Sequence, residues 1–122
     1  MNKTFNAKIL IDSLSESAVD AQKDIANKAL KGIIDRSPVK SGHYKKNHQV
    51  TIDAENNNEI PGTDPSGSAT LLRGRQEIEK IKELGHKITI QNNVPYAKDI
   101  EFGTSQQAPG GVYRLAKLDV IK

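Results

Sequence analysis

Apolar residues between positions 14 and 36 recur every three or four residues, the spacing of one face of an α-helix. These positions are Leu14, Ala18, Ala21, Ile25, Ala29, Leu30, Ile33 and Ile34. Ser13 or Ser15 can cap the start of this helix. Because a proline disfavours helical geometry at the residue before it, Pro38 predicts that the helix ends near Arg36.

Two later segments alternate between apolar and polar residues, as half-buried strands do. Residues 44–54 place His48, Val50 and Ile52 on one face, and residues 86–91 place two isoleucines inward. We expect these two strands to pair antiparallel, with the helices packed on one face of the sheet.

The two ends of the chain leave alternatives open. Residues 3–11 alternate in part, which fits a short strand, although residues 1–12 could instead form an N-terminal arm. The apolar positions of residues 112–122 favour a helix, although a strand through Leu118 and Val120 would also fit.

A second helix is predicted over residues 70–84, with Gly85 as its C-cap. Gly74 should weaken it by about 1 kcal/mol relative to alanine. Residues 55–68, ENNNEIPGTDPSGS, are rich in turn-forming residues, and we expect a long, exposed and mobile loop. The pattern therefore predicts one α+β domain over residues 1–122, in which a small antiparallel sheet packs against two or three helices.

The composition narrows the classes of function. Hydrophobic residues make up 35% of the 122 residues and aromatic ones 4%, so the core is lean. The absence of cysteine excludes disulfides, thiolate metal sites and a cysteine nucleophile. No apolar run approaches the roughly 20 residues of a membrane span, and none suits a signal peptide. We therefore expect synthesis in the cytoplasm of the cell that makes the protein and no membrane partner.

Catalytic and metal-binding signals are weak. The histidines are His43, His48 and His86, but no G-x-S-x-G segment supplies a nucleophile turn. His43 and His48 are five residues apart, which does not suit metal binding on one helix face. We predict no catalytic residue, no metal and no cofactor, and we expect mostly exposed histidines, with His48 at the edge of the core.

Residues 91–111, QNNVPYAKDIEFGTSQQAPGG, contain a dense series of local signals. The two asparagines end a strand, Pro95 begins a helix over residues 96–102, and Gly103 stops it. A purely structural interpretation of this segment predicts that Tyr96, Ile100 and Phe102 are core residues. A polar loop follows over residues 104–111.

Glu101 stands near the end of this predicted helix, where the helix dipole disfavours an anion. We therefore predict a specific partner for its carboxylate, either a cation or backbone N–H groups. The cationic candidates are Arg36, Lys45, Arg73 and Arg114.

This segment resembles the tail-completion, or neck, proteins of tailed bacteriophages, the family that includes the lambda minor tail protein Z. Its motif is close to N-N-x-P-Y-A-x-x-x-E-[FY]-G-[TS]-S-x-Q-A-P-x-G. The matching positions that we expect at an interface are Asn93, Pro95, Tyr96, Glu101, Gly103, Thr104, Ser105, Gln107, Ala108 and Pro109. A second family stretch, S-P-V-D-T-G-x-x-x-x-N-W, matches at Ser37, Pro38, Gly42 and Asn47. The chain departs from it at Lys40, where the family has Asp, and at His48, where it has Trp.

The resemblance implies a non-enzymatic virion protein of the tail or neck. Six identical subunits would form a ring that completes the head-proximal end of the tail tube and enables head–tail joining. Its partners would be other copies of itself, the tail tube protein and the head connector or neck proteins, while DNA passes through the channel without sequence-specific binding. We expect residues 104–111 and the loop at 56–68 to supply contacts, the loop becoming ordered on assembly.

Two other functions remain open. A non-enzymatic nucleic-acid-binding protein, including a toxin-type regulator, would use the basic residues near Tyr44 and along the second helix. Another head–tail connector or a tail tube subunit would share the structural role but occupy a different place.

Overall fold

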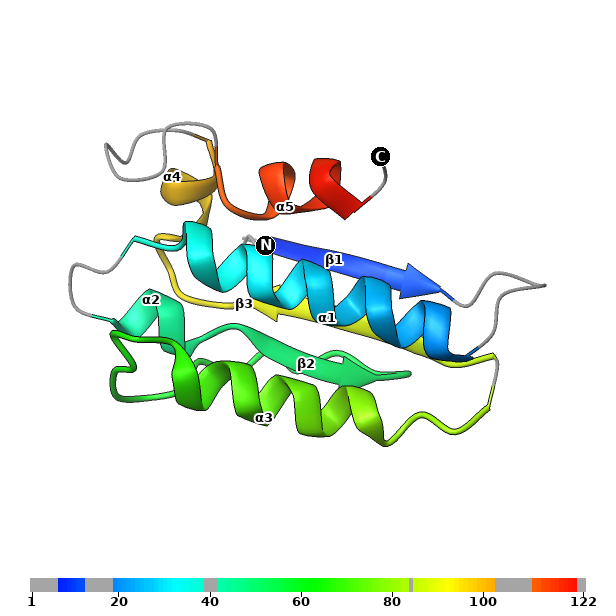
Figure 1. The fold of residues 1–122 in the computed structure, drawn as a ribbon. Helices are drawn as coiled ribbons and strands as arrows, with labels where there is room; N and C mark the ends of the chain where they lie inside the picture. Colours follow the sequence, from blue (N-terminus) through cyan, green and yellow to red (C-terminus); the bar gives the residue numbers. More distant parts are fainter. Residues whose placement is uncertain (1–6, 13–18, 39–41, 84, 103–110, 121–122) are drawn as a thin grey trace, which may run out of the picture.

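The computed structural model describes residues 7–12, 19–38, 42–83, 85–102 and 111–120. Within this part of the chain the fold is α+β, with a three-stranded antiparallel sheet and five helices (Figure 1). The elements are β1 (Ala7–Asp12), α1 (Val19–Arg36), α2 (His43–Lys46), β2 (Gln49–Ile52), α3 (Ser68–Glu79), β3 (Lys87–Asn92), α4 (Ala97–Glu101) and α5 (Tyr113–Val120).

β3 is the central strand of the sheet, in the order β1-β3-β2. Both neighbours pair with it antiparallel, and Ile90 lies opposite Ile9 on one side and Val50 on the other. The predicted antiparallel pairing of the second and third strands is therefore confirmed. The alternating N-terminal segment supplies a strand over residues 7–12, while residues 1–6 lie outside the described part.

The two faces of the sheet differ in chemistry. Side chains of Ile9, Val50 and Ile90 share one face, because they stand directly opposite one another in the register. α1 and α3 lie side by side over this face, and α5 packs beside α1 (Figure 1). The other face carries polar residues such as Thr89 and Gln91, which are nevertheless buried.

The strand that the sequence predicts over residues 44–54 is wrong at both ends. Gly42, at φ 79°, begins the short helix α2 instead, and this helix buries Tyr44 and Lys45. Strand β2 is confined to residues 49–52, because Asp53 takes a left-handed conformation at φ 58°. Alternation alone did not reveal that Tyr44 packs inward from a helical turn.

The helix boundaries follow local signals in part. α1 ends at Arg36 as predicted, while residues 13–18, where its start was expected, are not described. α3 ends at Glu79, earlier than the predicted residue 84. The N–H groups of Lys80 and Ile81 bond to carbonyls three residues back, and this tighter turn directs Ile81 into the core. Gly85 therefore turns the chain toward β3 at φ 100° rather than capping the helix.

Gly74 has a packing role that its low helix propensity conceals. A Cβ at this position would lie 2.4 Å from Cδ2 of Leu30 and 3.0 Å from Cγ2 of Val50. Glycine thus lets α3 approach both α1 and the sheet closely.

Candidate assembly interface

The first family motif spans residues 92–111 and the second spans residues 37–48. Their described parts meet at one end of the molecule, where α2 and α4 lie (Figure 1). Asn92, at the end of β3, donates from Nδ2 to the backbone carbonyl of Tyr44, with a distance of 2.8 Å. Its Oδ1 accepts the N–H of Val94 at 3.1 Å. One buried amide therefore joins the second motif to the turn that begins the first.

His48 is the centre of a buried hydrogen-bond network. The Ser37 hydroxyl donates to the Ile33 carbonyl at 2.7 Å, so its oxygen must accept the hydrogen bond from Nε2 of His48 at 2.6 Å. This fixes the neutral tautomer with hydrogen on Nε2, and Nδ1 accepts the hydroxyl of Tyr113 at 2.9 Å. Asn92 Nδ2 also approaches Nδ1, at 3.3 Å.

Burial of His48 is complete, which makes the expectation of an exposed or core-edge ring wrong. Desolvation, with smaller contributions from Lys45 and Arg73, lowers the pKa of His48 to about 3. The ring is therefore neutral at ordinary pH. It packs edge-on against the ring of Tyr44, with centroids 4.9 Å apart.

The Ser37–His48 pair has the composition of a nucleophile and its base, but its geometry serves packing. The Ser37 proton is already donated to Ile33, and both side chains are buried away from any substrate. The other ring nitrogen of His48 accepts from Tyr113 instead of donating to an orienting carboxylate. Among the described residues, no group of three or more His, Cys, Asp or Glu could hold a metal ion.

Glu101 binds the N-terminus of α5. Its Oε1 accepts the N–H groups of Val112 at 3.2 Å and Tyr113 at 2.9 Å, and Oε2 accepts that of Arg114 at 2.7 Å. The carboxylate lies where the α5 dipole is positive, which offsets its position at the end of α4. The predicted specific partner is confirmed as backbone N–H groups; Arg114, one of the cationic candidates, contributes through its backbone.

Gly111 allows this contact. At φ 87°, it lies so close that a Cβ would be 2.5 Å from the Glu101 carbonyl oxygen and 2.9 Å from Oε2. The ends of the segment at 103–110 are thereby held together. The predicted interface residues Gly103, Thr104, Ser105, Gln107, Ala108 and Pro109 lie outside the described residues.

Amide side chains attach the loop at 55–68 to the polar face of the sheet. Asn93 Nδ2 donates to the carbonyls of Asn56 at 2.5 Å and Asn58 at 3.0 Å. Gln91 accepts the N–H of Asn56 at 3.1 Å, and Gln49 donates to the Asn58 carbonyl at 2.7 Å. The loop thus covers the sheet face opposite the long helices.

A second set of contacts holds the middle of the loop. Asn47 donates to the carbonyl of Ile60 at 2.9 Å and accepts its N–H at 2.7 Å. The two ring nitrogens of His43 lie 2.7 Å from the Gly62 carbonyl and 2.5 Å from Glu59 Oε2. The hydrogen bond to Glu59, followed by that to Gly62, raises the pKa of His43.

The second motif has a structural role in this arrangement. Gly42 accepts the N–H of Asp64 at 2.9 Å, and a Cβ on Gly42 would lie 2.7 Å from the backbone nitrogen of Pro65. Ser37 and Asn47 are buried anchors, and Pro38 is half-buried between them. The predicted mobility of the loop stays a prediction, but these hydrogen bonds favour one conformation before assembly.

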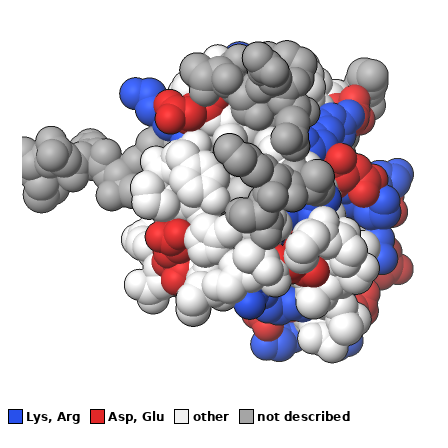
Figure 2. All heavy atoms as spheres, turned by 90° about the vertical axis from the view of Figure 1, so that its left-hand side faces the viewer, with Lys and Arg blue, Asp and Glu red and all other residues white. Residues whose placement is uncertain are grey.

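Two exposed aromatic residues lie at this end, one on each side of α4 in the sequence. Tyr96 is 40% exposed and Phe102 is 59% exposed, so their predicted core position is wrong, while Ile100 is buried as predicted. α4 directs Ala97, Ile100 and Glu101 inward, which leaves Phe102 outside. Figure 2 shows this end with uncharged residues near its centre and most charges toward the side of the long helices.

Many of the described basic residues have a carboxylate partner. Several cations are paired with carboxylates, as are Lys23 with Glu79 at 3.1 Å and Lys8 with Glu55 at 3.0 Å. Further pairs are Lys28–Asp24, Lys31–Asp35, Arg36–Asp119 and Lys80–Glu77. None of the described helices is long and apolar enough to cross a membrane.

A family model described as "Bacteriophage HK97-gp10, putative tail-component" matches residues 4–103. This span contains the whole second motif and the part of the first motif that ends at Gly103. No curated protein and no solved structure matches the chain.

Proposed function

The chain belongs to the HK97-gp10 family of bacteriophage tail components, and from this premise we propose that it completes the head-proximal end of the tail tube and enables head–tail joining. Membership makes it a structural component of the virion tail that contacts other virion proteins. Its position at the neck, its non-enzymatic role and its assembly as a ring of six are our proposals.

One observation carries the proposal: the family motifs build a single end of the molecule and leave apolar side chains on it. Their buried members, such as Asn47, Asn93 and Glu101, fix the backbone of this end. Tyr96 and Phe102 remain exposed beside the attachment points of residues 103–110. Exposed aromatic rings on a pre-ordered frame suit protein–protein contact, because little conformational entropy is lost on binding.

A ring would use this end as one half of a heterologous contact, in which two different patches of neighbouring copies meet and rotation closes the assembly. Residues 104–111 and the exposed part of the loop at 56–68 would contribute, since both are attached to this end. The tail tube and the head connector would occupy the two open faces of the ring.

The nucleic-acid-binding alternative has less support. Sequence-blind DNA binding needs unpaired cations that displace counterions from phosphates. On the described surface, many cations are instead paired with neighbouring carboxylates. A channel that DNA passes through, without being retained, fits this mixed surface better. A different connector or tube position remains the second candidate, and the same experiment separates the two.

The test is deletion of the gene from the phage that encodes the chain, followed by electron microscopy of the lysate. We expect filled heads beside separate tails. Tails that fail to form at all would favour a tube subunit, and intact infectious virions would contradict a structural role.

Complementation with variants tests the surface. We expect the double variant Tyr96→Ala, Phe102→Ala to fold and to leave heads and tails unjoined. Leu118→Ala is the matched control, because Leu118 is 50% exposed on α5, away from the motif end. Equal complementation by both variants would exclude the motif end as the contact surface.

A further inference from the structure

The outer edge of β2 has no strand partner in the described part of the chain. Asp53 donates its N–H to the Lys87 carbonyl at 2.8 Å, which sets the phase of the β2–β3 ladder. In an antiparallel pair, bonded and non-bonded residues alternate, so Thr51 faces β3 with its backbone groups. The N–H and C=O groups of Val50 and Ile52 therefore point away from the sheet.

Arg73 supplies a side-chain donor to the first carbonyl along this edge. From α3 its Nη2 donates to the carbonyl of His48 at 3.0 Å and to that of Lys46 at 2.9 Å. The His48 carbonyl belongs to the same outward-pointing series as those of Val50 and Ile52. α3 thus covers the first part of the edge with one guanidinium and leaves the next two residues.

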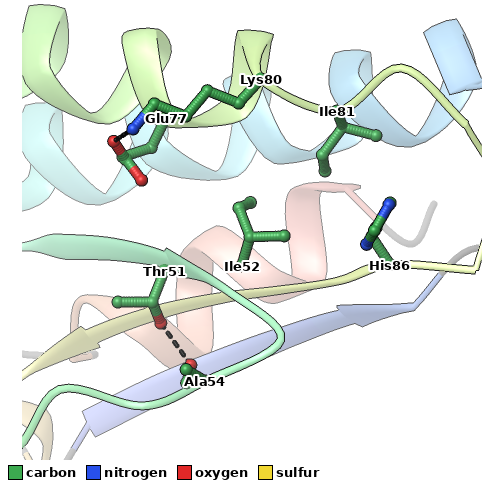
Figure 3. Close-up of a pocket in the computed structure, with 7 residues that line it drawn as sticks. All are labelled: Thr51, Ile52, Ala54, Glu77, Lys80, Ile81 and His86. Carbon is green, nitrogen blue, oxygen red and sulfur yellow. Dashed lines mark hydrogen bonds and ion pairs between the residues drawn. The ribbon is translucent and has the colours of Figure 1, made fainter.

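A groove lies beside Ile52, at the end of β2 (Figure 3). Both Thr51 and Ile52 line it, although their side chains stand on opposite faces of the sheet. The lining continues through Ala54 to Glu77 and Lys80 of α3, so the groove lies between the end of β2 and the end of α3. The groove therefore adjoins Ile52, one of the two residues whose backbone groups point away from the sheet.

The groove has an apolar floor and a neutralised rim. Ile52 and Ile81 face each other between β2 and the end of α3 (Figure 3). On the rim, Lys80 pairs with Glu77 at 2.5 Å, and His86 pairs with Asp53 at 2.6 Å. Because these charges already have partners, the groove favours an uncharged, apolar side chain.

We propose that the edge of β2 binds an extended segment of another virion protein by strand addition. The segment would hydrogen-bond to the backbone of Val50 and Ile52 and place one apolar side chain on Ile52 and Ile81. Main-chain bonds supply affinity in this mode of recognition, and alternate side chains supply specificity. The inference rests on the proposed structural role in the tail, but it does not require a position at the neck.

The arrangement of strands favours a different protein over a second copy. β3 is central, and α4 and α5 lie alongside β1 (Figure 1). Pairing of β2 with β2 of another copy would produce a two-fold dimer, which does not build the ring that we propose.

Hydrogen exchange of the isolated protein, followed by NMR, tests the open edge. We expect the amides of Val50 and Ile52 to exchange at least 100-fold faster than that of Thr51, which is bonded to β3. Similar protection of all three amides would overturn the proposal, because the edge would then already be covered.

A photo-crosslinking residue in place of Thr51, incorporated into assembled tails, tests the occupant. We expect a crosslink to one segment of a different virion protein, identified by mass spectrometry, and none to that segment from position 118. A crosslink to another copy of this chain, or none from position 51, would overturn the proposal. Loss of head–tail joining on gene deletion is a separate readout, so failure of the neck assignment would not be mistaken for failure of strand addition.

Discussion

The carboxylate of Glu101 and the backbone of Gly111 are in direct contact, with no room for a Cβ between them. These two residues are ten positions apart, and their contact closes the base of the segment between them in the first family motif. The same carboxylate begins α5 by accepting three N–H groups. One side chain thus connects the ends of a motif loop to the helix that follows.

Glu101→Ala should destabilise the protein by about 2 kcal/mol, because three N–H groups lose a charged acceptor. Glu101→Gln should lose less, since one oxygen remains. Chemical denaturation measures both values, and Glu83→Gln, at an exposed position, is the control. If Glu101→Ala behaves like Glu83→Gln, the carboxylate does not hold α5.

His48 should make the protein sensitive to acid. Its folded-state pKa of about 3 lies below the ordinary histidine pKa of 6.5, so the unfolded chain binds the extra proton between these values. The free energy of unfolding should therefore fall as pH drops from about 6.5 to about 3, by up to about 5 kcal/mol from this residue.

Comparison with His48→Gln isolates that contribution, because the carboxylates titrate in both proteins. The variant should be less stable at pH 7, since Ser37 and Tyr113 lose well-placed partners. Its stability should then depend less steeply on pH between 6.5 and 3. Parallel pH profiles would contradict the neutral, buried tautomer.

His43 should behave in the opposite way. Both of its ring nitrogens face acceptors, so the full set of hydrogen bonds requires the imidazolium form. Its pKa is raised above 6.5, and its contribution to stability should be present below that value and lost as pH rises through the folded-state pKa. NMR titration measures this pKa. Glu59→Gln should lower the pKa of His43. The pKa of His86, whose partner is Asp53, should stay unchanged and serves as the control. An unchanged pKa of His43 would exclude its contact with Glu59.

Asn47→Ala should weaken the attachment of the loop. It removes the hydrogen bonds of a fully buried amide to Ile60 and to the His43 carbonyl, at a cost of roughly 2 kcal/mol. The amide of Ile60 should also exchange faster in NMR. Asn58→Ala is the matched control, because that side chain is exposed; equal effects would mean that Asn47 is not an anchor.

Gly74→Ala tests whether packing outweighs helix propensity. Alanine favours an isolated helix by about 1 kcal/mol, whereas overpacking against Leu30 and Val50 costs about 1–3 kcal/mol. We expect a net loss of stability in thermal or chemical denaturation. A more stable variant would show that α3 can shift away from α1 without penalty.

Local chemistry made much of this fold predictable. The proline after Arg36, the alternation around Ile88 and Ile90, and the signals from Pro95 to Glu101 each act within a few residues, and each located an element correctly. The helix of the C-terminal segment was also the favoured alternative.

The errors concern residues whose environment comes from distant parts of the chain. Alternation places polar residues of β2 and β3, such as Gln49 and Gln91, on the face opposite the isoleucines, but it does not reveal that the loop at 55–68 covers them. His48 is buried because Ser37 and Tyr113, from opposite ends of the chain, supply its hydrogen bonds. A possible signal was the coincidence of amide-rich strands with an amide-rich loop, since such residues can satisfy one another's backbone and side-chain groups.

The sheet order has a consequence for synthesis of the protein. Ile9 pairs with Ile90, so the first strand made must wait for the last strand before the sheet can close. At translation rates of roughly 5–20 residues per second, that wait is roughly 4–16 s. Throughout this interval the apolar stripe of α1 lacks the sheet that covers it. The nascent chain would therefore be a substrate for chaperones until β3 emerges, and closure of the sheet would be coupled to the synthesis of that strand.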